Sequence, residues 1–93
     1  MKKYENLKSM LRENYNISLF DDNSIVEEYI LLGTENYAIS VFIEDEEFFQ
    51  IIIERKNKIK DRWEEVETRR YITTKPAYKF IKSWMDTIKV IEE

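Results

Sequence analysis

Acidic side chains are concentrated in one part of the chain. From residue 13 to residue 54 the sequence holds eleven Asp and Glu residues and no Lys or Arg. Clustered carboxylates create a negative field that steers a basic partner into place. Turns and the residues beside them supply the candidates for such a partner-binding surface, which are Asp21, Asp22, Glu35, Glu44, Asp45, Glu46 and Glu47.

The sign of the charge reverses in the next part of the chain. Residues 55–82 carry ten basic and four acidic side chains. Basic residues interleaved with aromatic ones are typical of proteins that bind single-stranded nucleic acid, because cations contact phosphates and rings stack on bases. The alternative, nucleic-acid-binding surface would comprise Arg55, Lys56, Lys58, Lys60, Arg62, Trp63, Arg69, Arg70 and Tyr71.

Other interpretations of these charges stay open. Neighbouring strands of opposite charge can pair with each other across the solvated face of a sheet. The oxygen-rich stretches 21–23 and 44–47 could hold a hard cation, but neither has the spacing of a calcium loop, so we expect no metal site. A third functional alternative is a structural homo-oligomer that forms through an edge strand at 62–72.

The composition excludes several catalytic chemistries. The chain has no Cys, no His and one Gly. This excludes disulfides, thiolate nucleophiles, His-based triads, zinc sites built on His or Cys, and Gly-rich phosphate loops. Adjacent carboxylates such as Glu64 and Glu65 would point to opposite faces of a strand and would not meet around a substrate. We therefore expect neither an enzyme nor a cofactor.

The sequence shows no targeting or membrane segment. Lys2 and Lys3 are not followed by an apolar stretch of the length that a signal peptide needs. No uncharged run approaches the roughly 18 apolar residues of a membrane span. We expect a cytoplasmic protein without membrane contact, folded as a single domain over residues 1–93.

Strands are predicted to position most of the charged residues. Residues 37–55 alternate apolar and other side chains on both sides of the acidic run 44–47, which predicts a hairpin. Residues 25–32 predict a strand that joins this hairpin through the connection 33–36, which contains the only Gly. Residues 62–72 favour another strand, with a helix as the alternative. Composition indicates a turn at 21–24, a linker or brief strand at 17–20, and a turn near Asn57 and Asp61.

A helix with one apolar stripe is predicted at each end of the chain. In the first, over residues 2–15, the stripe comprises Tyr4, Leu7, Leu11 and Tyr15, with Met10 beside them. The second begins with Thr73 or Thr74 as its cap and Pro76 in its first turn. Its stripe comprises Ala77, Ile81, Trp84, Ile88 and Ile91, widened by Phe80, Met85 and Val90.

These elements predict an α+β domain of order α-β-β-β-β-α, in which both helices cover one face of an antiparallel sheet of three to four strands. The best functional interpretation is a non-catalytic protein-binding module. It would be a small acidic inhibitor or regulator that docks on a basic, nucleic-acid-binding surface of a larger protein. By analogy of size and charge alone, such a protein would suit a phage or mobile element, as an anti-CRISPR-type product.

Overall fold

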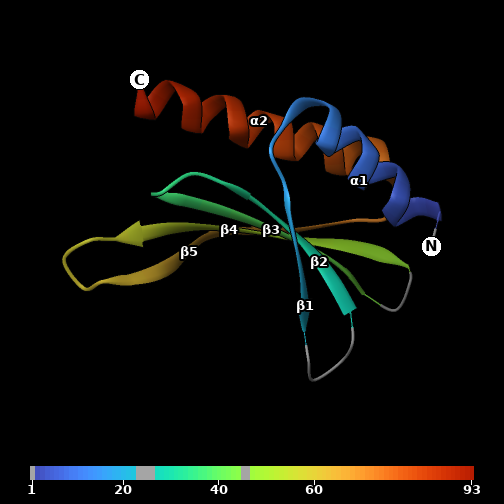
Figure 1. Cartoon of the computed structure of the whole chain (residues 1–93), viewed down its shortest axis with the longest axis horizontal. Helices are drawn as coiled ribbons and strands as arrows, with labels where there is room; N and C mark the ends of the chain where they lie inside the picture. The colour runs from blue at the N-terminus through green and yellow to red at the C-terminus, as the bar shows by residue number, and fades with distance from the viewer. Residues whose placement is uncertain (1, 23–26, 45–46) are drawn as a thin grey trace.

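A computed structural model describes residues 2–22, 27–44 and 47–93, with the backbone alone at Asp22 and Glu27. The chain begins with helix α1 and ends with helix α2, and five strands lie between them (Figure 1). Their bounds are α1 Lys2–Asn14, β1 Ser18–Asp22, β2 Glu27–Gly33, β3 Tyr37–Glu44, β4 Phe48–Asn57, β5 Arg62–Tyr71 and α2 Thr74–Glu92.

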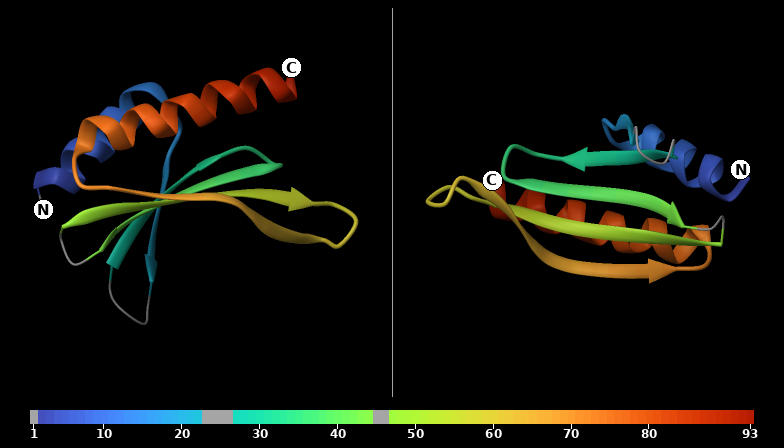
Figure 2. Two further views of the ribbon diagram at one scale, coloured as in Figure 1. Left: turned by 180° about the vertical axis from the view of Figure 1, so that it is seen from behind. Right: turned by 90° about the horizontal axis from the view of Figure 1, so that it is seen from below.

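The five strands form one antiparallel sheet in the order β1-β2-β3-β4-β5. Each strand therefore lies beside its neighbour in the sequence, and short connections suffice. The sheet is strongly twisted, and both helices lie on the same side of it (Figures 1 and 2). One face of the sheet is thus covered by helices, and the other is open.

The core lies between the helices and the covered face. In β3 and β4 every second side chain is buried there, including Ile39, Val41, Ile51 and Ile53, as the period of a strand requires. The helices contribute residues at helical spacing, namely Tyr4, Leu7 and Leu11 from α1 and Ala77, Ile81 and Ile88 from α2. Strand β2 adds Ile30 and Leu32, which shows which of its two rows is buried.

The predicted fold class is confirmed, and the sheet has one strand more than expected. The additional strand is β1, which includes the stretch whose composition indicates a linker or brief strand. The turn predicted at 21–24 is wrong for Asp21 and Asp22, which end β1 and pair with Glu28 and Glu27; Asn23 and Ser24 lie outside the described residues. Pairing with β2 outweighs the weak strand preference of Asp.

The remaining elements follow the sequence closely. Residues 62–71 form a strand and not a helix. The turn before this strand lies where it was predicted, near Asn57 and Asp61. Asn57 Oδ1 accepts hydrogen bonds from the backbone N–H groups of Ile59 (3.1 Å) and Lys60 (3.0 Å), and Asp61 has a backbone φ of 51°, in the left-handed region. The stripe of α2 extends less far than predicted, because Val90 and Ile91 are 73% and 56% exposed. Among the described residues, no helix is long and apolar enough to cross a membrane.

Candidate interaction surface

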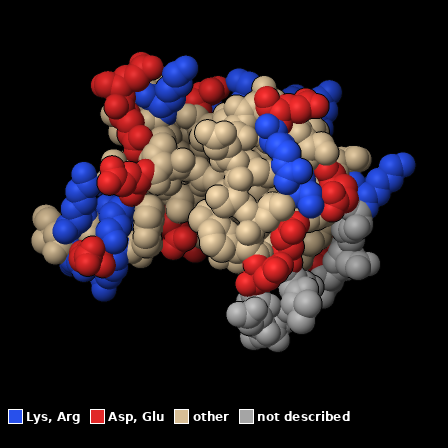
Figure 3. Space-filling view, viewed as in Figure 1, with Lys and Arg blue, Asp and Glu red and all other residues tan. Residues whose placement is uncertain are grey.

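The topology brings most of the predicted acidic residues to one end of the sheet. Strand β1 ends with Asp21 and Asp22, β3 ends with Glu44, and Glu47 precedes β4, so these residues lie beside or in hairpin connections at the same end of the sheet. Figure 3 shows acidic side chains beside the adjoining ends of β1 and β2. We call Asp21, Glu44 and Glu47 the acidic end. Asp45 and Glu46, which were predicted to belong with them, lie outside the described residues.

Glu35 does not belong to this group. It lies in the connection between β2 and β3, at the opposite end of the sheet. There the last turn of α2 is bound to the same connection, since Thr34 Oγ1 donates a hydrogen bond to Glu92 Oε1 (2.6 Å). The acidic surface predicted from the sequence is therefore divided, with Glu35 separated from the rest by the length of the strands.

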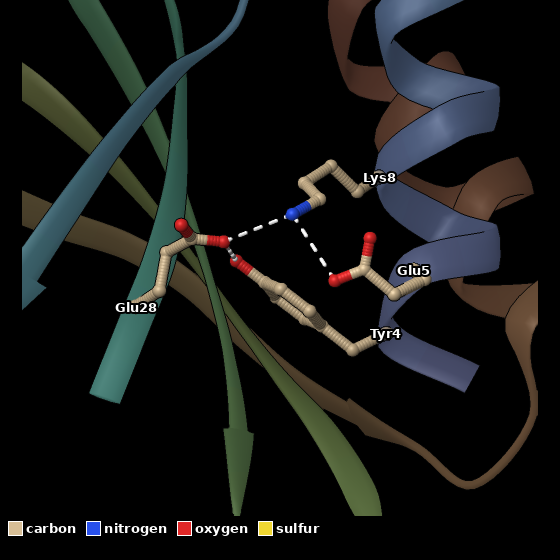
Figure 4. Close-up of polar contacts among 4 residues, drawn as sticks. All are labelled: Tyr4, Glu5, Lys8 and Glu28. Atoms are coloured by element: carbon tan, nitrogen blue, oxygen red, sulfur yellow. Dashed lines mark hydrogen bonds and ion pairs between the residues drawn. The ribbon is translucent and has the colours of Figure 1, made fainter. Parts of the chain in front are cut away.

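A polar cluster fixes α1 over the strand next to the acidic end (Figure 4). The hydroxyl of Tyr4 donates a hydrogen bond to Glu28 Oε2 (2.7 Å), and Lys8 Nζ lies 3.1 Å from the same oxygen. Lys8 also contacts Glu5 Oε1 at 3.2 Å. The hydrogen bond from Tyr4, together with that from Lys8, holds the pKa of the Glu28 carboxyl below its usual range. Glu28 is thereby bound within the protein.

Internal pairing neutralises only part of the acidic block. Among the described residues, the carboxylates of this block form two ion pairs, Glu28 with Lys8 and Glu44 with Arg70, the second at 3.8 Å. Most other ion pairs lie within the basic part of the chain, such as Lys56 with Asp61. Within the described residues, Asp21 and Glu47 have no ion-pair partner and are exposed. Lys3 Nζ donates a hydrogen bond to the backbone oxygen of Glu47 (2.6 Å), so one ammonium group lies beside these carboxylates. The acidic end keeps the carboxylates of Asp21 and Glu47 for a partner.

The open face of the sheet carries an aromatic row that the sequence reasoning missed. Phe20 on β1, Tyr29 on β2 and Phe42 on β3 project from this face. The ring centroids of Phe20 and Tyr29 are 5.6 Å apart and those of Tyr29 and Phe42 are 4.7 Å apart, both in stacked geometry. Because Tyr29 has a ring on either side, the row presents ring edges outward. Phe20 remains 43% exposed.

A shallow hollow lies on the same open face, where Gly33 and Ala38 pair with each other. It has a volume of about 220 Å³, and Leu31 and Trp63 are among the residues that line it. The signal for this apolar face was present in the sequence, since both rows of several strands carry apolar residues. Their alignment depends on the registers of two hairpins, which the sequence alone did not define.

The predicted nucleic-acid-binding residues separate into two groups. Arg55, Lys56, Lys58, Lys60, Arg62 and Trp63 surround the protruding loop between β4 and β5, where Figure 3 shows Lys and Arg side chains gathered. Arg69, Arg70 and Tyr71 lie at the other end of β5.

The aromatic members of these two groups are engaged within the protein. The ring of Tyr71 packs against Phe80 of α2, with 5.6 Å between the centroids, and Lys56 Nζ lies 5.7 Å from the centroid of the Trp63 ring. The structure thus does not assemble these residues into one platform.

The described residues contain no group of three acidic side chains placed to hold a metal ion. The adjacent carboxylates Glu64 and Glu65 lie opposite Arg55 and Glu54, which point to opposite faces of the sheet, so the two carboxylates do not converge.

Comparison of the chain with protein-family models, with curated proteins and with solved structures found no match.

Proposed function

We propose that the chain is a non-catalytic protein-binding module, which docks on a basic surface of a larger protein and acts as its inhibitor or regulator. The docking surface consists of the acidic end and the aromatic row beside it on the open face of the sheet. The observation that carries the proposal is the juxtaposition of the acidic end, in which Asp21 and Glu47 have no ion-pair partner among the described residues, with a partly exposed aromatic row.

The chemistry of the surface favours a protein as the partner. Protein interfaces commonly have aromatic residues at their centre and charged residues at their rim. The faces of the Tyr29 ring contact Phe20 and Phe42 and are unavailable for stacking on nucleic-acid bases. Carboxylates beside the row repel phosphates and attract Lys and Arg. A basic groove that normally binds nucleic acid is the kind of partner surface that fits these features.

The first experiment captures partners from a lysate of the organism that encodes the chain, with nuclease added. The test variant is Glu44→Lys with Glu47→Lys, and the matched control is Glu13→Lys with Glu35→Lys. The control changes the net charge equally but alters residues in α1 and in the connection at the other end of the sheet. We expect a protein that the native chain and the control retain, and that the test variant loses.

A second variant tests the apolar part of the surface. Phe42→Ala removes one member of the aromatic row, and we expect it to weaken binding of the captured protein at least tenfold, as truncation of central aromatic residues commonly does. Equal binding by the native chain, the charge-reversed variant and Phe42→Ala would reject the proposed surface. Retention that depends on nucleic acid, with loss on nuclease treatment, would reject the proposed partner class.

A further inference from the structure

Strand β5 forms an uncovered edge of the sheet. It pairs with β4 on one side, and in Figure 2 no described element lies along its other side. An edge strand presents backbone N–H and C=O groups that a further strand can pair with. The side chains along this edge are accessible, with Trp63 40% and Val66 46% exposed. This edge of the sheet is therefore accessible to another strand.

The charges of β5 change sign along its length. Its first half holds Glu64 and Glu65 with one basic residue, Arg62, and its second half holds Arg69 and Arg70 with one acidic residue, Glu67. Charged side chains usually protect an edge, because an approaching strand meets unpaired or like charges. An antiparallel copy of the same strand instead brings its basic half opposite the acidic half. The edge is thus complementary to itself in this orientation and repulsive in the parallel one.

A bulge in β5 selects one register for this pairing. Glu67 lies opposite Ile53 of β4 whereas Glu65 lies opposite Glu54, so Val66 is an additional residue. The extra residue reverses the alternation of faces along the strand. Suppose that the twofold axis of a dimer passes between residues 66 and 67 of the two paired β5 strands. The two residues that face each other across the interface then point to the same side of the sheet.

The faces of the paired side chains agree with this register. Glu64 and Arg69 lie opposite Arg55 and Ile51 of β4 and face the helices. Trp63 and Arg70 lie opposite Lys56 and Gln50 and face the open side. The twofold axis places Glu64 opposite Arg69 of the second copy, and Trp63 opposite Arg70 of the second copy.

We infer that the chain forms a symmetric homodimer by antiparallel pairing of two β5 strands in this register. Each Glu64–Arg69 ion pair and each Trp63–Arg70 cation–π contact occurs twice. Within one copy Glu64 already contacts Arg62 (3.6 Å) and Arg69 already contacts Glu67 (3.1 Å), so the dimer contacts add to these pairs or replace them. The twofold symmetry closes the assembly, so association stops at the dimer. Strand β1, the other edge, has five residues and ends with two Asp residues, so it does not offer the same self-complementarity. The inference is independent of the proposed function, because no other partner takes part.

Sedimentation velocity over a range of concentrations tests the dimer. The native chain should shift from monomer to dimer as its concentration rises. Glu64→Arg alone and Arg69→Glu alone should each weaken dimerisation roughly tenfold or more, since the altered pair occurs twice in the interface. An equimolar mixture of the two variants should dimerise again. In the mixed dimer the two introduced side chains, of opposite charge, face each other, and the native Glu64 and Arg69 that remain form the second pair.

Matched controls separate this contact from a general effect of charge. Glu35→Arg and Lys79→Glu change the net charge by equal amounts at exposed positions outside β5, and both should dimerise as the native chain does. Circular dichroism identifies the variants that remain folded. A native chain that stays monomeric at its highest soluble concentration overturns the inference. A mixture that associates no better than its separate components overturns the proposed register.

Discussion

Glu28 differs from the other acidic residues of its block, because its carboxylate is bound within the protein. It accepts hydrogen bonds from Tyr4 and Lys8 of α1, and these lower its pKa. Burial and the neighbouring Glu28 carboxylate raise the pKa of the Tyr4 hydroxyl. Tyr4 therefore keeps its proton and donates this hydrogen bond at all ordinary pH values. This contact joins α1 to β2 and thereby to the strands that carry the acidic end.

The lowered pKa of Glu28 predicts a pH dependence of stability. A carboxyl whose pKa is lower in the folded state stabilises the fold above its usual pKa, and this contribution disappears as the pH falls through the folded-state value. We expect Glu28→Gln to lower the free energy of unfolding at pH 7 and to match the native chain at low pH. Urea denaturation at a series of pH values measures both.

The control for this prediction is Glu13→Gln, which removes an exposed carboxylate of α1 outside the cluster. It should leave the pH profile of the native chain almost unchanged. A constant difference in stability between Glu28→Gln and the native chain across the whole pH series would contradict the assigned role of the Glu28 charge.

At the scale of elements, the connection between β2 and β3 depends on Gly33. This residue has a φ of 138°, and a Cβ atom added to it would collide with the backbone oxygen of Tyr37. That oxygen accepts the hydrogen bond of Thr34 N–H (2.8 Å), which closes the connection. Gly33→Ala therefore introduces both steric overlap and an unfavourable backbone conformation.

We expect Gly33→Ala to lower the free energy of unfolding by about 1–3 kcal/mol, the usual cost of a strained backbone position. Chemical denaturation provides the measurement. Glu35→Ala is the control, because it changes an exposed side chain of the same connection, and it should shift stability by less than about 0.5 kcal/mol. Equal stability of Gly33→Ala and the native chain would show that the connection can adopt another conformation.

The sequence predicted those elements whose pattern is local. The alternation in β3 and β4 and the stripes of α1 and α2 follow from side-chain periods of two and about 3.6, so the core residues were recognisable. Strand β1 was only an alternative, because its five residues end in Asp and become a strand by pairing with β2. The aromatic row was missed because Phe20, Tyr29 and Phe42 meet only through the registers of two hairpins.

At the scale of the whole molecule, the charges are distributed unequally between the two ends of the sheet. The acidic end, Asp21, Glu44 and Glu47, lies opposite the basic loop between β4 and β5. The chain has a net charge of −4, but an approaching partner experiences the field of the end that it meets. The orientation in which the chain meets a partner is therefore determined by the difference in charge between the two ends, and the net charge alone would not determine it.

This asymmetry leads to a prediction about the kinetics of the proposed binding. Surface charges act mainly during approach, and salt screens them over a distance of about 10 Å at ~0.1 M. Raising the salt concentration from ~50 mM to ~200 mM should slow association several-fold, whereas dissociation should change little because the aromatic row is the apolar part of the contact. Surface plasmon resonance with the captured partner measures both rates.

The charge-reversed variants show whether the acidic end causes this dependence. Glu44→Lys with Glu47→Lys should associate slowly at ~50 mM salt and respond little to further salt, because the steering charge is absent. Glu13→Lys with Glu35→Lys should keep most of the salt response despite the same net charge. If both variants lose it equally, net charge governs the encounter, and the asymmetry of the molecule has no part in recognition. If salt instead changes mainly the dissociation rate, the carboxylates belong to the desolvated centre of the interface, and the aromatic row lies at its rim.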